Sequence, residues 1–239
     1  MRERLPLFAG LTFVAVALGV GSALIASGIR DRGHNDVLTV TGSAKQRIVS
    51  DYVIWTSHVS SQQPTAAAAA KEITAWTARV RAFFQTQGVE AAELTLAPVS
   101  ASLPGSYASD GGKVKGYLLE RDFEIRSARV AAIAHVAEES RSLLAEGVPL
   151  AVDPPEYVYT KLPALRPKLL AAAMRDAQAR AKVLVTASGV KLGHLRGVDV
   201  GVFQVTAPNS TDVSDYGTYD TSTLDKDVTA VVNVTFALG

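Results

Sequence analysis

Residues 37–55, VLTVTGSAKQRIVSDYVIW, decide how this chain should fold. The segment is rich in the β-branched and aromatic residues of strands, and it is broken by Gly42 and Asp51. We interpret Gly42 as a bend or bulge in a first strand, residues 37–47. Asp51 is interpreted as a turn residue whose carboxylate bonds nearby backbone N–H groups before a second strand, residues 51–61.

The elements after this entry repeat in one order: strand, helix, strand, strand. The first group spans residues 51–126 and the second spans residues 155–238, with a separate helix over residues 128–146 between them. The predicted helices of the two groups cover residues 64–87 and 167–188, each beginning at a proline. The remaining predicted strands cover residues 93–103, 116–126, 155–161, 195–205 and 228–238. This order predicts an α+β fold of two βαββ-like units, with helices packed on a mostly antiparallel sheet.

Residues 5–29, LPLFAGLTFVAVALGVGSALIASGI, carry no charge. About 20 apolar residues cross a bilayer as a helix, so this segment predicts one transmembrane signal anchor before the folded part. Arg2 and Arg4 precede it. The positive-inside rule therefore places the amino terminus in the cytoplasm, the anchor in the inner membrane as a single pass, and the rest in the periplasm or an equivalent extracytoplasmic space. The alternative is a cleaved secretory signal ending at the small residues 26–28.

Residues 30–36, RDRGHND, are predicted to be a polar tether, and residues 37–239 the folded domain. The chain has 24 basic and 23 acidic residues, of which Arg2, Arg4 and Glu3 precede the tether, so the remainder has no net charge. Without a basic stripe, nucleic-acid binding is not expected. The chain also has no cysteine, which excludes disulfides and thiol chemistry.

No catalytic pattern emerges from the sequence. The histidines, His34, His58, His135 and His194, are not at metal-ligand spacing. There is no G-x-S-x-G elbow and no strand-borne phosphate-binding glycine loop. We therefore predict no catalytic, cofactor-binding or metal-binding residue and no enzymatic activity. The polar run over residues 206–227 is predicted to be a mobile, solvated loop, and a small-ligand site there is the alternative.

The folded part resembles the SIMPL domain family (DUF541), whose bacterial members include the 26-kDa periplasmic immunogenic protein. The resemblance begins at Gly42 and Asp51 and is most specific in AMRDAQARAKVLVTASGVKLGHL. It covers about residues 37–239, and its family-motif positions are Gly42, Asp51, Gly88, Gly116, Tyr117, Ala173, Ala177, Ala181, Gly189 and Gly193. Leu184 departs from the alanine series.

The resemblance implies a cell-envelope protein without established enzymatic activity, linked in some relatives to oxidative stress. It also implies self-assembly, because some relatives form large ring- or channel-like homo-oligomers. We accordingly expect a non-catalytic, membrane-anchored protein that acts by self-assembly or by binding an envelope protein partner; a ring with a channel-like role is the alternative. The nearly bare alanine face at Ala173, Ala177 and Ala181 suits either packing on the chain's own sheet or a subunit contact.

Overall fold

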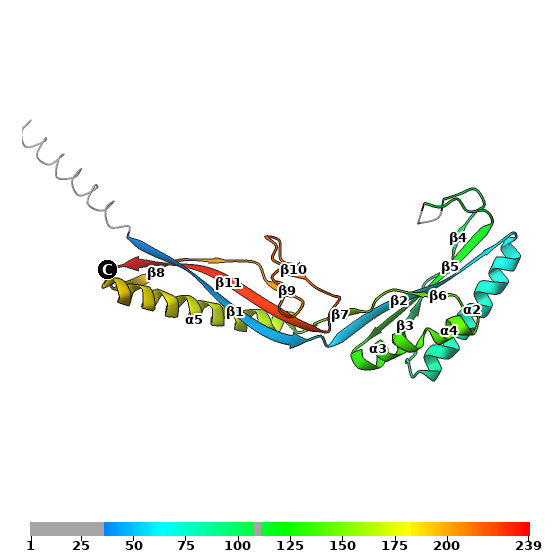
Figure 1. Ribbon diagram of the computed structural model, residues 1–239, viewed down its shortest axis with the longest axis horizontal. Helices are drawn as coiled ribbons and strands as arrows, with labels where there is room; N and C mark the ends of the chain where they lie inside the picture. Colours follow the sequence, from blue (N-terminus) through cyan, green and yellow to red (C-terminus); the bar gives the residue numbers. More distant parts are fainter. Residues whose placement is uncertain (1–35, 108–110) are drawn as a thin grey trace, which may run out of the picture. The chain divides into compact units, whose positions relative to one another are not determined.

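The computed structural model describes residues 36–107 and 111–239 (Figure 1). The helices are α2 (Ala66–Thr86), α3 (Val130–Glu139), α4 (Ser142–Ala145) and α5 (Leu162–Ser188). The strands are β1 (Val37–Val49), β2 (Tyr52–Gln63), β3 (Leu94–Leu96), β4 (Ser100–Ser102), β5 (Tyr117–Ser127), β6 (Leu150–Val152), β7 (Glu156–Val158), β8 (Leu192–Val200), β9 (Gln204–Thr206), β10 (Thr218–Tyr219) and β11 (Asp225–Leu238).

Among these helices none is long and apolar enough to span a bilayer. The predicted anchor, residues 5–29, and all of the predicted tether except Asp36 lie outside the described residues. The described chain divides into two compact units. Unit 1 holds residues 36–44, Leu170–Gly201 and Val231–Gly239; unit 2 holds Lys45–Leu169 and Val202–Ala230.

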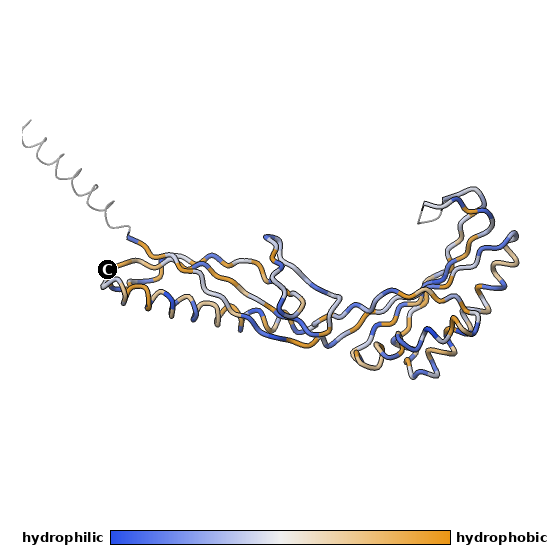
Figure 2. The backbone as a smooth tube through the Cα atoms, viewed as in Figure 1, coloured by the Kyte–Doolittle hydropathy of each residue, from blue (hydrophilic) through white to orange (hydrophobic). Residues whose placement is uncertain are grey.

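Unit 2 is built on the long antiparallel pair of β2 and β5. The pairing runs from Val53 opposite Ser127 to Gln63 opposite Tyr117. β3 and β4 pair with β5 on one side, and β6 and β7 pair with β2 on the other. Side chains alternate along β2 between buried and half-buried. Figure 2 shows hydrophobic and hydrophilic residues interspersed along the strands of this unit.

Helix α2 covers this sheet with one apolar stripe. Ile73, Val80 and Phe84 are buried, and Trp76 and Phe83 pack against them. The Phe84 ring meets the rings of Trp55 and Phe123 edge-on, at centroid distances of 5.7 Å and 6.0 Å. Such edge-to-face contacts add to the energy of burial alone. The core of unit 2 therefore lies between α2 and the β2–β5 pair, and α3 contributes Ile133 and Val136 to it.

Several predicted boundaries in unit 2 are wrong, each for a local reason. The strand over residues 93–103 is two short strands, β3 and β4, because Pro98 between them has no N–H to donate to a ladder. The helix over residues 128–146 is likewise two helices, α3 and α4. Ser127 ends β5 and accepts a hydrogen bond from the Arg129 N–H at 2.9 Å. Helix α2 begins after a Thr65 cap, so Pro64 precedes it.

Unit 1 is a small antiparallel sheet with one helix on it. The beginning of β1 and the end of β11 are neighbours, and hydroxyl bonds from Thr39 to Thr235 (3.0 Å) and from Thr41 to Asn233 (2.7 Å) join them. β8 pairs with β11 on its other side, with Val232 opposite Val200. The core packs apolar strand residues against the alanines of α5: Val40, Val232, Val234, Phe236, Ala173, Ala177 and Ala181.

The second predicted βαββ unit does not form as expected. Its first strand is reduced to β7, which pairs with β2 in the other sheet, while β1 takes the place beside β11. Helix α5 begins at Leu162, so Pro167 lies inside the helix and not at its start. The strand over residues 195–205 is interrupted after Val200 and gives β8 and β9. The α+β class and the mostly antiparallel pairing are confirmed; β9 and β10 pair in parallel.

Candidate functional site

Gly42 allows strand β1 to pack closely against helix α5. β1 runs through Gly42 without interruption, so the expected bend or bulge is absent there. A Cβ atom at this position would lie 2.2 Å from the Ala173 carbonyl oxygen and 2.7 Å from the Ala177 Cβ. Ala173, Ala177 and Ala181 are themselves fully buried on the same sheet. The alanine face is therefore occupied by packing within unit 1.

Asp51 joins distant parts of unit 2. Its carboxylate accepts hydrogen bonds from the Thr160 N–H (2.7 Å) and hydroxyl (3.0 Å), and it pairs with Lys161 at 3.3 Å. Partial burial raises the pKa of Asp51, but the bonds from Thr160 and Lys161 outweigh burial and hold the pKa below its ordinary value. The predicted turn role is thus replaced by a link to the start of α5.

The remaining motif glycines serve the backbone. Gly88 and Gly189 follow α2 and α5 with φ of 80° and 73°, a conformation in which glycine ends helices without strain. Gly116 has no room for a side chain, because a Cβ atom would lie 2.4 Å from the Gln63 carbonyl oxygen; Tyr117 beside it pairs with Gln63. Gly193 lies against Ala237 in the same way. All these positions have a structural role and offer no reactive group for a functional site.

β8 is an exposed edge strand. Among the described residues it pairs with β11 alone, and everything from Gly193 to Val200 is exposed. Leu195, Val198 and Val200 have exposed fractions of 49%, 43% and 52%. Val198 and Val200 stand opposite Val234 and Val232, so they point to the face of the sheet that α5 covers. Their exposure shows that α5 leaves the β8 side of this face open.

Two opposite charges lie on this edge. Asp199 stands opposite Asn233, on the face away from α5, and Arg196 falls where the register between β8 and β11 shifts. Neither forms an ion pair with another described residue. An unpaired edge with exposed apolar side chains can pair with another strand, whereas charges on an edge oppose pairing unless the second strand supplies their counter-charges.

The outer side of α5 in unit 1 is basic. Arg175, Gln178, Lys182 and Val183 are exposed, on the side away from the buried alanines. Residues 177–198 contain four basic residues and no acidic one: Arg180, Lys182, Lys191 and Arg196. Between α5 and β1 lies a groove of about 600 Å³ that is flanked by Arg180, Val183 and Leu184.

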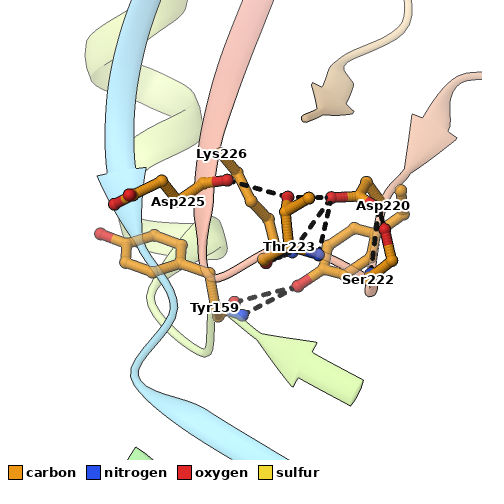
Figure 3. A network of polar contacts seen from close by, with 7 residues as sticks. Tyr159, Asp220, Ser222, Thr223, Asp225 and Lys226 are labelled. Atoms are coloured by element: carbon orange, nitrogen blue, oxygen red, sulfur yellow. Dashed lines mark hydrogen bonds and ion pairs between the residues drawn. The ribbon is translucent and has the colours of Figure 1, made fainter. Parts of the chain in front are cut away.

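The polar run over residues 206–227 is bound into unit 2 by its carboxylates. The Asp220 carboxylate accepts bonds from the Ser222 and Thr223 backbone and hydroxyl groups, and it lies 3.3 Å from the ammonium group of Lys226 (Figure 3). Lys226 is completely buried and also donates to the Thr223 carbonyl. Burial lowers the pKa of Lys226 despite the carboxylate beside it. For Asp220, burial acts to raise the pKa, and the bonds from Ser222 and Thr223 together with Lys226 lower it well below its usual range.

A second carboxylate, Asp227, is 3% exposed and is held by cations from β1. Arg47 lies 2.9 Å away and Lys45 3.5 Å away, and the Asn209 N–H donates at 3.1 Å. The Arg47 bond and the Asn209 N–H lower the pKa of Asp227 to about 2. The prediction of a solvated loop is therefore wrong at the end of this run, where internal partners compensate the buried charges of Lys226 and Asp227.

The described residues contain no group of three or more His, Asp or Glu side chains arranged to hold a metal ion. A groove of about 330 Å³ next to Trp55 is lined chiefly by Arg141, Glu138, Tyr157, Pro154 and Pro155. The Trp55 indole donates to the Asp153 carbonyl at 3.0 Å. Within the described part of the chain, this groove presents neither a nucleophile paired with a base nor clustered carboxylates.

The family model described as "SIMPL: Protein of unknown function (DUF541)" matches residues 38–236. The chain belongs to the SIMPL family. A comparison with curated proteins found no match.

In this SIMPL domain the motif residues are used for packing, and the surface features lie elsewhere. Sequence reasoning missed the Asp220–Lys226 pair, although Asp220 followed by Ser222 and Thr223 is a typical pattern of side-chain bonds to a local backbone. It also missed the β8 edge, where Arg196 and Asp199 are separated only by small and apolar residues. The signal in the sequence is a strand that carries both an arginine and an aspartate and does not alternate polar with apolar residues.

Proposed function

We propose that this SIMPL chain is a non-catalytic cell-envelope protein that is anchored in the inner membrane by residues 5–29 and acts through self-association. The observation that supports the proposal is the open β8 edge, with exposed Leu195, Val198 and Val200 along it. A role in an envelope or oxidative-stress response rests on the family resemblance and belongs to the same proposal.

The charges on β8 suit a second copy of the same strand. If two β8 strands pair antiparallel about a two-fold axis through Val198, and Arg196 is the extra residue in this pairing as it is against β11, Gly197 of each copy stands opposite Asp199 of the other and Arg196 lies beside that Asp199. The same register sets Leu195 opposite Val200, so an apolar pair flanks each charged pair. Cross-strand pairs of both kinds are stabilising, and a two-fold contact makes each of them twice.

The test is the mass of the full chain in a membrane-like detergent, measured by light scattering over micromolar concentrations. We expect a dimer. Arg196→Asp and Asp199→Arg each place like charges beside one another across the contact and should give monomers. The double swap Arg196→Asp/Asp199→Arg restores opposite charges and should restore the dimer. A monomeric wild-type chain would overturn self-association, and single variants that dimerise like wild type would exclude this register.

A ring-like assembly with a channel-like role is the second candidate, because β1 is the opposite edge strand of the same small sheet. Pairing of β8 with β1 of a second copy is a head-to-tail contact, and such contacts close into rings or continue as filaments. This assembly predicts a mass well above a dimer, no rescue by the double swap, and faster leakage from liposomes that carry the protein than from empty ones.

A small-ligand site in the run over residues 206–227 has less support. Asp220 and Asp227 are the carboxylates of this run whose pKa is lowered most, and they already bind Lys226 and Arg47. A ligand would have to displace these partners or use other groups of the run. Deletion of residues 209–223 with retention of the fold and loss of binding would be the result that favours it.

A further inference from the structure

We propose that the outer face of α5 in unit 1 rests on an anionic phospholipid surface. The surface consists of Arg175, Lys182, Val183 and Leu184 on α5, together with Val190 and Lys191 just after it. We call it the basic α5 face. This inference rests on the anchoring part of the proposed function, because the anchor brings unit 1 to the bilayer.

The tether between the apolar segment and β1 is short. Residues 30–36 separate the apolar segment from the first residue of β1. At about 3.5 Å per extended residue, these seven residues span at most ~25 Å. The start of β1 must therefore lie within that distance of the membrane surface if residues 5–29 cross the bilayer.

Within unit 1, the start of β1 lies beside the ends of three other elements. The Leu238 N–H donates to the Asp36 carbonyl at 2.8 Å, and Lys191 and Gly239 exchange two backbone bonds at 3.0 Å and 3.2 Å. The end of β11 and the start of β8 are thus fixed beside it, and the Val190 N–H bonds to Val185 at the end of α5. Figure 1 shows these four element ends together. Apart from Arg175, the basic α5 face lies in the last two turns of α5 and just after it, at the end of unit 1 that the proposed tether would hold near lipid.

The basic α5 face combines basic side chains with exposed apolar ones. Val183, Leu184 and Val190 are apolar, yet their exposed fractions are 68%, 50% and 39%. Lys182 and Lys191 flank them. The nearest acid on the helix, Asp176, is held by the Ser43 N–H and by Arg180, each at 2.8–2.9 Å. Basic residues beside exposed apolar ones are typical of helices that lie in the headgroup region of anionic membranes.

The geometry of the proposed dimer agrees with this orientation. A two-fold axis between antiparallel edge strands stands perpendicular to the sheet, so both copies of α5 lie on the same face of the joined sheet. A helix packs about 10 Å from the sheet that it covers. The tether is long enough to pass this layer, so both anchors can enter the bilayer that the two helices face.

The natural chain has no cysteine, so single cysteines can report the contact. Leu184→Cys and Val190→Cys are prepared in the full chain, labelled with an environment-sensitive fluorophore, and reconstituted into vesicles. The matched control is Asn233→Cys, an exposed β11 position in the same unit on the face away from α5. The vesicles contain phosphatidylglycerol and a lipid that carries a quencher near its headgroup. We expect loss of fluorescence at residues 184 and 190 and little loss at residue 233.

Lys182→Gln/Lys191→Gln should weaken docking by about fivefold for each charge removed, and raised salt should weaken it further. Vesicles of phosphatidylcholine alone should show little quenching at any position. If the full chain resists extraction from the vesicles but residues 184 and 233 are quenched equally, the basic α5 face does not bind lipid, and the proposed anchor stands. If the chain is extracted from vesicles of either composition, the anchoring proposal fails and this inference fails with it.

Discussion

A Cβ atom on Gly42 would lie 2.2 Å from the carbonyl oxygen of Ala173. Strand β1 and helix α5 therefore touch through backbone, and neither residue can grow without separating them. The small residues that mark the family in this segment are explained by that contact.

Gly42→Val should destabilise unit 1 by about 3 kcal/mol or more, because the obstructing atoms belong to backbone that cannot rotate away. The measurement is the denaturant midpoint of the detergent-solubilised full chain. Gly197→Ala is the control, since a Cβ atom there meets nothing within 4 Å. Equal midpoints for Gly42→Val and wild type would refute the role of the contact.

The buried pair of Lys226 and Asp220 should show strong coupling. Asp220→Asn leaves a fully buried ammonium group without its counter-charge and should cost about 3–5 kcal/mol of unfolding free energy. Lys226→Met together with Asp220→Asn removes both charges and should recover part of that loss. A double-mutant cycle of unfolding free energies measures the coupling, and additive single effects would show that the pair is not a unit.

Acid should destabilise unit 2 through Glu93. Arg129 and the Ser127 hydroxyl, which is 2.5 Å away, bind the Glu93 carboxylate and lower its pKa from 4.5 to about 2. Because the folded pKa lies below the unfolded one, this stabilisation is complete above about pH 4.5 and is lost as the pH falls towards 2. Glu93→Gln should flatten the pH dependence of the unfolding free energy in this window. Titration curves as steep as wild type would assign the effect to other carboxylates, such as Asp227.

Two adjacent phenylalanines should differ in their contribution to the core. Phe84 is fully buried between Trp55 and Phe123, whereas Phe83 packs at the margin. Phe84→Ala should cost about 3–5 kcal/mol, and Phe83→Ala clearly less. Thermal unfolding followed by circular dichroism compares the two variants directly. A loss for Phe83→Ala as large as that for Phe84→Ala would contradict the assigned core.

The regular elements of this SIMPL domain could be predicted because their own residues determine them. The alternation in β2 and β5 and the apolar stripe of α2 each require one buried face. The irregular boundaries depended on other causes. Pro98 divides a strand, while Pro167 is tolerated inside α5, and no local pattern separates these two outcomes.

The pairing partners of the strands were harder to predict than the strands themselves. The pairing of β7 with β2, and of β1 with β11, joins strands across long stretches of sequence, and a three-residue strand carries too little pattern to indicate its neighbour. For the same reason, the sequence did not indicate that the Asp51 carboxylate bonds to Thr160. The β8 edge could be recognised as a surface only when its neighbours in the sheet were known.

Lys226 offers a use beyond stability. A lysine with no exposed atoms is protected from amine-reactive reagents while its surroundings stay closed. Acylation of the native chain, read by mass spectrometry, should therefore mark the surface lysines quickly and Lys226 only when the segment that covers it opens. The acylation rate of the Lys226 amine therefore measures how often this segment opens, and the measurement needs no added label.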